Sequence, residues 1–226
     1  MNPSKNTPEI GSGVYSVPDA ADILGFPIDK IRRWIKSYWE NKFADDGTPY
    51  TWGEGRDRGF NFYTLVELIA IYALRENNVS FKKIIEARSH LKDTLNVEYP
   101  FATKKVMSDG EKFFYQIDQE LLLDVNLKNQ YSFKDIVEPY CNKLDFDAID
   151  TLAERFWPLG KDRNVVVDPK HRFGEPTISG TNIAVDIIAG MASKGEKISK
   201  IAKLYDLTED QVTDAIEFKN GPRIAA

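Results

Sequence analysis

The fold of the N-terminal part is decided by the stretch from Ser16 to Arg33, with the sequence Ser-Val-Pro-Asp-Ala-Ala-Asp-Ile-Leu-Gly-Phe-Pro-Ile-Asp-Lys-Ile-Arg-Arg. Ser16 and Asp19 have the spacing of a capping box, in which each residue satisfies a backbone N–H of the other. Gly25 permits a tight turn before a second helix begins near Pro27. The stretch therefore predicts a helix-turn-helix, the unit that places its second helix in the DNA major groove.

The second helix combines an apolar stripe with a basic face. Ile28, Ile31 and Ile35 recur at the spacing of a buried stripe. From this segment alone, an ordinary helix pair with a solvated basic face is an equal alternative to DNA binding. The basic residues that we expect off the buried stripe are Lys30, Arg32, Arg33 and Lys36.

A polar, glycine-rich stretch over residues 45–60 follows and carries Arg56 and Arg58. Tyr50 and Trp52 alternate at its start, which indicates the strands of a small hairpin or wing. The stretch therefore predicts a small wing after the second helix, with Arg56 and Arg58 as its arginines.

Two longer helices are predicted next, one opening at Thr64 with Glu67 as its capping partner and one capped by Ser80. This order, and the segments Tyr-Ser-Val-Pro-Asp-Ala-Ala-Asp-Ile-Leu-Gly-Phe, Ile-Arg-Arg-Trp and Phe-Tyr-Thr-Leu-Val-Glu-Leu, resembles the MerR-type winged DNA-binding domain over about residues 14–91. The resemblance implies that Arg32 and the wing arginines contact DNA. The chain departs from that family in a longer wing and in the pair Arg33-Trp34, where an aromatic pair is usual.

Composition limits the remaining classes. The 226 residues are 42% hydrophobic, and we see neither an apolar run long enough to cross a bilayer nor a signal peptide, so we expect a soluble, cytoplasmic protein. Cys141 is the single cysteine, and with two histidines the chain has no cysteine- or histidine-rich metal site. The net charge of −5 favours a local basic patch over a wholly basic surface.

The middle of the chain has mixed character. Tyr99-Pro100 ends the preceding helical pattern, and Asp109-Gly110 between alternating residues predicts a hairpin. Helical patterns resume over 120–127 and 133–144. We interpret the aromatic stripes of this segment as core or dimer contacts in preference to a ligand site.

The C-terminal part begins with short strands at 165–167 and 177–181 around a turn-rich loop, followed by helices over 185–194, 199–205 and 209–218. The last two form a second helix-turn-helix. Its last helix would repel phosphate groups, so we expect it to contact protein instead. The carboxylates concerned are Glu209, Asp210, Asp214 and Glu217.

The run Val-Asp-Pro-Lys-His-Arg-Phe-Gly-Glu-Pro-Thr-Ile-Ser-Gly-Thr-Asn-Ile-Ala-Val and the segment Lys-Ile-Ser-Lys-Ile-Ala-Lys-Leu-Tyr-Asp-Leu-Thr-Glu-Asp-Gln-Val resemble the domain-of-unknown-function family 433, over about residues 165–219. With the MerR-like part in front, nearly the whole chain resembles the long VapB-type antitoxins. The resemblance implies a PIN-like ribonuclease toxin as partner and autoregulation of a type II toxin–antitoxin operon. The implied domains are a DNA-binding domain (14–96), a connector with candidate dimer contacts (97–164) and a toxin-binding antitoxin-type domain (165–226).

PIN-type nucleases cut RNA with clustered carboxylates that hold divalent metal ions. An arginine or lysine inserted there would pair with those carboxylates. Arg223 in the C-terminal tail is one candidate, with a disordered tail as the alternative, and the loop around His171 and Arg172 is another. The candidate toxin-binding residues are His171, Arg172, Phe218, Lys219 and Arg223.

The predicted fold class is mainly α with small β-hairpins: a MerR-like winged helix-turn-helix, an α+β connector and a small helical C-terminal domain. The predicted function is that of an antitoxin that neutralises a PIN-like ribonuclease and binds operator DNA as a homodimer, forming a heterotetramer or larger complex with the toxin. We expect no enzymatic activity, cofactor, metal or membrane partner. The alternative is a MerR-like transcriptional regulator with a ligand-sensing C-terminal region.

Overall fold

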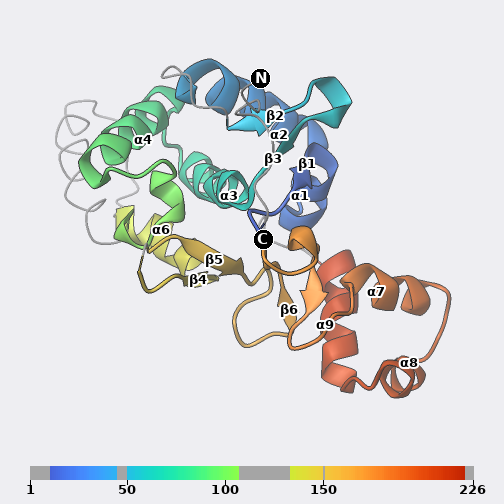
Figure 1. Cartoon of the computed structure of the whole chain (residues 1–226). Helices are drawn as coiled ribbons and strands as arrows, with labels where there is room; N and C mark the ends of the chain where they lie inside the picture. The colour runs from blue at the N-terminus through green and yellow to red at the C-terminus, as the bar shows by residue number, and fades with distance from the viewer. Residues whose placement is uncertain (1–10, 45–49, 107–132, 150, 222–226) are drawn as a thin grey trace, which may run out of the picture.

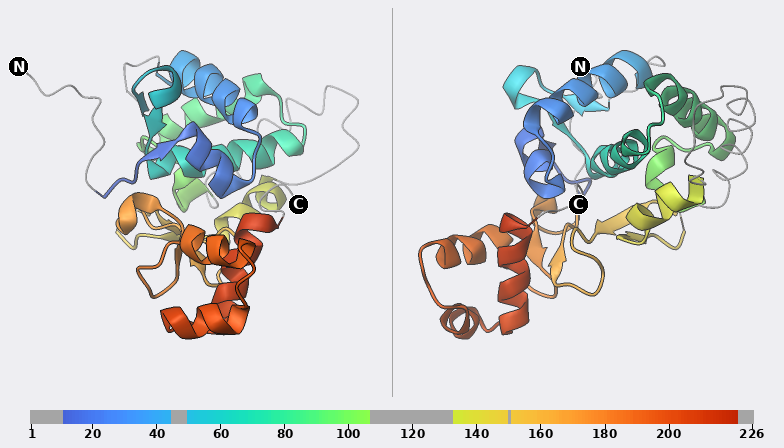
Figure 2. Two further views of the ribbon diagram at one scale, coloured as in Figure 1. Left: turned by 90° about the vertical axis from the view of Figure 1, so that its right-hand side faces the viewer. Right: turned by 180° about the vertical axis from the view of Figure 1, so that it is seen from behind.

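The computed structural model describes residues 11–44, 50–106, 133–149 and 151–221. The fold is mainly helical with small antiparallel sheets, as predicted. A larger unit lies above a smaller one in Figure 1, and both views of Figure 2 show the same two-part arrangement. In the described part of the chain, none of the helices combines the length and the apolar character needed to cross a bilayer.

The helix pair at the N-terminus forms as its local sequence predicts. α1 (Val17–Leu24) opens with the capping box, in which the Ser16 N–H donates to the Asp19 carboxylate at 2.8 Å. Gly25 ends α1 in the left-handed region, at φ 71°, and α2 (Ile28–Trp34) follows. A residue with a Cβ would be strained at this φ, so the glycine fixes the short turn between the two helices.

Two of the three residues in the predicted apolar stripe of α2 are buried. Ile31 and Ile35 are fully buried, whereas Ile28 is 43% exposed because the first residue of α2 lies at the edge of the core. The chain then continues into a π-helical segment, η1 (Ile35–Phe43). Three aromatic side chains of this π-helical segment are buried in the core, whereas Ile28 at the start of α2 is not. These side chains are Tyr38, Trp39 and Phe43.

A three-stranded antiparallel sheet joins the start of the chain to the predicted hairpin. The strand order is β1 (Tyr15–Ser16), β3 (Gly59–Phe60), β2 (Thr51–Trp52). β2 and β3 pair directly, and a 3-10 turn, η2 (Gly55–Asp57), lies between them. The hairpin therefore falls inside the glycine-rich stretch where the sequence predicts it.

Two 15-residue helices follow, α3 (Phe62–Glu76) and α4 (Phe81–Leu95). Ser80 caps α4 as predicted. The predicted start of α3 is wrong, because Asn61 caps it by accepting a hydrogen bond from the Thr64 N–H at 2.9 Å. Glu67 is therefore free of any capping role and lies in the core.

Glu67 and Arg88 form a buried ion pair between α3 and α4. Their side chains are 0% and 2% exposed, and Arg88 Nη2 lies 2.9 Å from Glu67 Oε2. The Phe101 N–H donates to Glu67 at 3.3 Å, and Arg88 donates to the Glu98 carbonyl at 3.0 Å. The guanidinium also stacks 4.1 Å from the centroid of the Phe43 ring. This pair connects both long helices to the segment that follows them.

The middle segment shares the core of the larger unit. Its elements are η3 (Pro100–Ala102), α6 (Phe133–Cys141), β4 (Leu144–Phe146) and β5 (Ala153–Phe156). The predicted helix over 133–144 extends too far, because Leu144 opens the β4–β5 pair. Cys141 is buried in α6, where burial raises the pKa of its thiol to about 12. The predicted hairpin around Asp109-Gly110 and the helix over 120–127 lie outside the described residues.

The smaller unit has its own core. Its elements are β6 (Val165–Val166), η4 (Arg172–Gly174), β7 (Thr177–Ile178), α7 (Val185–Ser193), α8 (Ile198–Tyr205) and α9 (Glu209–Asn220). β6 pairs antiparallel with β7, and Thr208 and Gln211 form the predicted capping box of α9. The fully buried side chains at its centre include Val165, Ile178, Ile188, Ile201, Val212 and Phe218.

Several contacts join the two units. Phe156 and Val167 exchange two backbone hydrogen bonds, of 3.0 and 2.9 Å. The Val14 N–H donates to the Phe173 carbonyl at 3.1 Å, which ties the start of the chain to η4. Lys219 of α9 lies 2.7 Å from Asp22 of α1. The helix pair α1–α2 is therefore held directly against the smaller unit.

Candidate functional site

Four of the six candidate DNA-binding side chains are exposed, and three of these lie on α2 and the start of η1. Arg32, Arg33 and Lys36 are all exposed. Arg32 pairs with Asp29 at 2.7 Å, but both side chains are more than half exposed, so solvent screens this pair strongly. Arg56 is also exposed, at the turn of the β2–β3 hairpin. These four cations can reach an anionic partner without breaking a buried contact.

The other two candidate DNA-binding residues are held by contacts within the chain. Lys30 pairs with Glu76 at 3.2 Å, and its ammonium lies 4.5 Å from the centroid of the Tyr72 ring. Arg58 pairs with Glu40, and its side chain is 21% exposed. Lys30 and Arg58 are therefore engaged in contacts within the chain, and the exposed candidate DNA-binding residues are Arg32, Arg33, Lys36 and Arg56.

The predicted acidic face of α9 is only partly exposed to solvent. Glu209 and Asp210 are exposed, whereas Asp214 is 5% exposed. Arg163 lies 2.6 Å from Asp214 and also pairs with Glu217, whose side chain is 48% exposed. The prediction of an exposed acidic face is therefore wrong for Asp214, which is buried and paired. The sequence could not indicate this, because Arg163 is more than 50 residues away along the chain.

Asp214 accepts hydrogen bonds from the Asn164 N–H at 2.8 Å and from the Asn164 side chain at 2.7 Å, besides Arg163. Burial alone would raise the pKa of Asp214, but these bonds hold it below its ordinary value. A carboxyl with a lowered folded-state pKa contributes stability above its unfolded pKa of about 3.9, and loses it as the pH falls through the folded value. The contact between α9 and the two residues before β6 therefore depends on an ionised Asp214.

We expect Asp214→Asn to lower the free energy of unfolding of the smaller unit by about 2–3 kcal/mol at pH 7, because charge-assisted hydrogen bonds are lost. The loss should start to shrink below about pH 4, where Asp214 of the unfolded chain takes up a proton, and should disappear once the pH lies below the lowered folded-state pKa. Urea unfolding of the full chain at pH 7 and below pH 4 measures both effects. Asp210→Asn is the matched control, because Asp210 is exposed on the same helix. An equal loss in both variants would contradict this role of Asp214.

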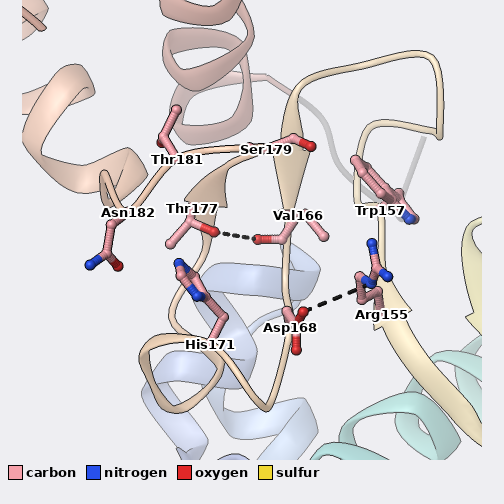
Figure 3. A pocket seen from close by; sticks show the side chains of 10 residues that line it. Arg155, Trp157, Val166, Asp168, His171, Thr177, Ser179, Thr181 and Asn182 are labelled. Atoms are coloured by element: carbon pink, nitrogen blue, oxygen red, sulfur yellow. Dashed lines mark hydrogen bonds and ion pairs between the residues drawn. The ribbon is translucent and has the colours of Figure 1, made fainter.

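A pocket of about 320 Å³ lies beside the loop that contains His171. Figure 3 shows Arg155 and Trp157 on one side and the hydroxyl and amide side chains of Thr177, Thr181 and Asn182 on the other. Arg155 Nε lies 3.8 Å from Asp168 Oδ2, a long distance for an ion pair, and the Arg155 side chain is 47% exposed. The pocket therefore presents a cation, an indole and several neutral polar groups to one space.

His171 and Arg172 are placed differently from each other. The Nε2 atom of His171 is buried at the edge of this pocket and has no hydrogen-bond partner among the described residues. Arg172 is exposed and pairs with Glu175 at 2.7 Å. Only His171 lines the pocket, whereas Arg172 faces the junction with α1.

The other three candidate toxin-binding residues do not form one surface with these. Phe218 is fully buried in the core of the smaller unit, so its side chain cannot contact a partner while this unit is folded. Lys219 pairs with Asp22 and with Asp186, each at 2.7 Å. Arg223 lies outside the described residues. Helical periodicity indicates the burial of Phe218, which lies on the same side of α9 as Val212 and Ala215.

One comparison with known proteins concerns the smaller unit. The family model described as "Protein of unknown function (DUF433)" matches residues 165–218. The predicted resemblance of the C-terminal part to this family is thereby confirmed. The matched range contains β6, β7 and the three helices of the smaller unit, together with the His171 loop.

Relatives and a solved structure extend the similarity to most of the chain. The chain is 26% identical over 223 residues to the Mycobacterium tuberculosis protein named "Putative antitoxin VapB45", covering 90% of this chain and 92% of that protein. It is 23% identical over 233 residues to "Uncharacterized protein Rv2308" of the same organism, covering 94% and 92%. The crystal structure of Rv2018 from M. tuberculosis has a TM-score of 0.69 at 24% identity, covering 89% of this chain and 96% of that chain. The last comparison concerns the fold alone.

Proposed function

We propose that this chain is the antitoxin of a type II toxin–antitoxin system, which binds operator DNA with its larger unit and neutralises a PIN-like ribonuclease with its smaller unit. The observation that carries the proposal is the similarity to a protein named as an antitoxin over 90% of the chain. The match of the smaller unit to DUF433 supports it. The two activities need separate surfaces, and the chain offers both.

The DNA-binding half of the proposal rests on the helix pair α1–α2. In a helix-turn-helix the second helix enters the major groove, and its exposed cations contact phosphates and base edges. Arg32, Arg33 and Lys36 project from this helix or its continuation, and Arg56 stands at the nearby hairpin turn. A single helix contacts few base pairs, so we propose that the chain binds an inverted repeat as a two-fold homodimer.

The toxin-binding half rests on the smaller unit. A PIN-like nuclease holds metal ions with carboxylates, so its inhibitor needs an accessible cation or a surface that covers the active site. Arg155 is about half exposed in the pocket beside the His171 loop, whereas Arg172 is exposed in the same loop but faces α1. We therefore assign inhibition to this loop region, with Arg223 of the C-terminal tail as the other candidate.

The proposal predicts that a neighbouring gene encodes a small nuclease with several spaced aspartates, and co-expression with that product tests it. We expect the nuclease alone to arrest growth, the pair to restore it, and the two proteins to purify as one complex that does not cleave RNA. The chain with Arg32, Arg33 and Lys36 changed to alanine is the control, because it should still restore growth while losing operator binding. Growth arrest that persists with wild-type chain, without complex formation, would refute the antitoxin function.

The pocket beside His171 favours a second candidate function, that of a transcriptional regulator with a ligand-sensing C-terminal region. A sensor needs a concave site with a few convergent polar groups. This pocket has the volume and the polar lining for a small ligand. A shift in operator affinity on addition of a small metabolite, lost in His171→Ala, would support this function in place of toxin binding.

A further inference from the structure

A second cleft, of about 280 Å³, lies at the junction of the two units, between α1 and the segment 172–186. It is distinct from the His171 pocket and shares none of its lining residues. Figure 1 shows the orange η4 segment directly beside α1. Any molecule in this cleft would touch the helix pair and the smaller unit at once.

The cleft contains a buried polar group without a partner. Tyr15 lines it, is only 1% exposed, and its hydroxyl has no hydrogen-bond partner among the described residues. A buried polar group left in this state costs about 1–3 kcal/mol. The hydroxyl lies against Gly174, where an added Cβ would come within 1.9 Å of it. Gly174 therefore makes room for the Tyr15 hydroxyl at the edge of the cleft.

The charge of the cleft is negative. Four carboxylates line it, and the cations beside them are Arg172, which pairs with Glu175, and Lys219, which is shared between Asp22 and Asp186. This excess of negative charge repels DNA phosphates and attracts a positively charged protein segment. The four carboxylates belong to Asp19, Asp22, Glu175 and Asp186.

The rim of the cleft exposes large apolar side chains. Val14 is 43% exposed and Phe173 is 75% exposed, and the Val14 N–H donates to the Phe173 carbonyl. Arg172 and Phe173 adopt positive φ angles of 48° and 56°, a conformation that costs of order 1–3 kcal/mol per residue when it is not glycine. The side chain of Phe173 is therefore exposed to solvent on a strained stretch of backbone. Exposed aromatic side chains are frequent anchors of protein interfaces.

We propose that this junction cleft is the docking surface for a positively charged segment of the toxin with apolar flanks. A lysine or arginine of that segment enters among the carboxylates and reaches the Tyr15 hydroxyl, while a neighbouring apolar side chain packs on Phe173 and Val14. The inference rests on the proposed antitoxin function and specifies the surface and the chemistry of its partner. The contact that blocks the nuclease site is separate from this docking contact.

Three measurements on the full chain, with the nuclease of the proposed toxin–antitoxin pair as probe, test the docking surface. A photo-crosslinking phenylalanine derivative at position 173 should form a covalent adduct with the nuclease in co-expressing cells. Phe173→Ala should weaken the complex by roughly 10- to 100-fold, in line with the loss of one aromatic anchor. Glu175→Gln should reduce the salt dependence of the affinity, and operator binding should stay unchanged in each variant.

Position 149 provides the matched control, because Ile149 is 93% exposed and does not line the cleft. Ile149→Ala should leave the affinity for the nuclease unchanged, and a crosslinker at position 149 should form no adduct with it. Phe173→Gly relieves the backbone strain but should weaken the complex as Phe173→Ala does. A nuclease that binds Phe173→Ala as tightly as wild type, without an adduct at 173, would overturn the docking surface and leave the antitoxin function intact. A nuclease that does not bind wild-type chain at all would refute the antitoxin function and, with it, this surface.

Discussion

A chain with Arg32, Arg33 and Lys36 all changed to alanine should bind operator DNA roughly 100- to 1000-fold more weakly than wild type near 0.1 M salt. All three side chains are exposed on one helical stretch, so their loss removes contacts without disturbing the core. Each lost phosphate contact should lower the slope of log affinity against log salt by about 0.9, or close to three units for the triple variant. Fluorescence anisotropy with labelled operator at several salt concentrations measures both quantities.

A second triple variant serves as the charge-matched control. Lys194, Lys197 and Lys203 are exposed in the smaller unit, and their change to alanine removes the same charge from another surface. We expect this variant to retain nearly all of its operator affinity. Equal losses in the two variants would mean that overall charge, and not the α2 surface, determines binding.

Arg88→Met should lower the free energy of unfolding by about 3–5 kcal/mol, enough to leave much of the chain unfolded under mild denaturing conditions. The variant leaves Glu67 buried with no cation beside it, because both side chains of the pair are almost completely excluded from solvent. It also removes the hydrogen bond to Glu98 and the stacking on Phe43. Equilibrium urea unfolding followed by circular dichroism gives the value.

Two further variants separate burial from charge. The double variant Glu67→Leu with Arg88→Met should recover much of the loss, since apolar replacement of a whole buried pair is often nearly neutral. Lys82→Met removes a cation from the exposed Lys82–Glu86 pair on the same helix and should cost less than about 1 kcal/mol. A small effect of Arg88→Met, comparable with that of Lys82→Met, would disprove the structural role of the buried pair.

Local features of the fold could be predicted from the sequence with good accuracy. The capping boxes at Ser16 and Thr208 and the turn at Gly25 each depend on residues a few positions apart. Such interactions are visible in a linear pattern, because the chain brings those residues together whatever the rest of the fold does. The exposed cations of α2 also follow from helical periodicity alone.

Features that depend on distant residues could not be predicted. Glu67 has the spacing of a capping residue, yet it lies in the core and forms an ion pair with Arg88. Asp214 belongs to a helical pattern typical of a solvated acidic face, yet it is buried, pairs with Arg163 and accepts a hydrogen bond from Asn164. The junction cleft combines the hydroxyl of Tyr15 with a loop more than 150 residues further along the chain. No local pattern contains these pairings, since they arise only when the folded chain brings residues together that are far apart in the sequence.

The contacts between the units also bear on how such chains can recombine during evolution. Val165 packs in the core of the smaller unit, whereas Val167, two residues later, packs in the core of the larger one. The loop that follows then lies against Tyr15 through Gly174. A gene fusion that joins the smaller unit of one relative to the larger unit of another at Val165 would separate Arg163 from Asp214 and Tyr15 from its matching glycine. Recombination should therefore preserve Tyr15, Arg163 and Gly174 as one inherited set, although they are spread over most of the chain.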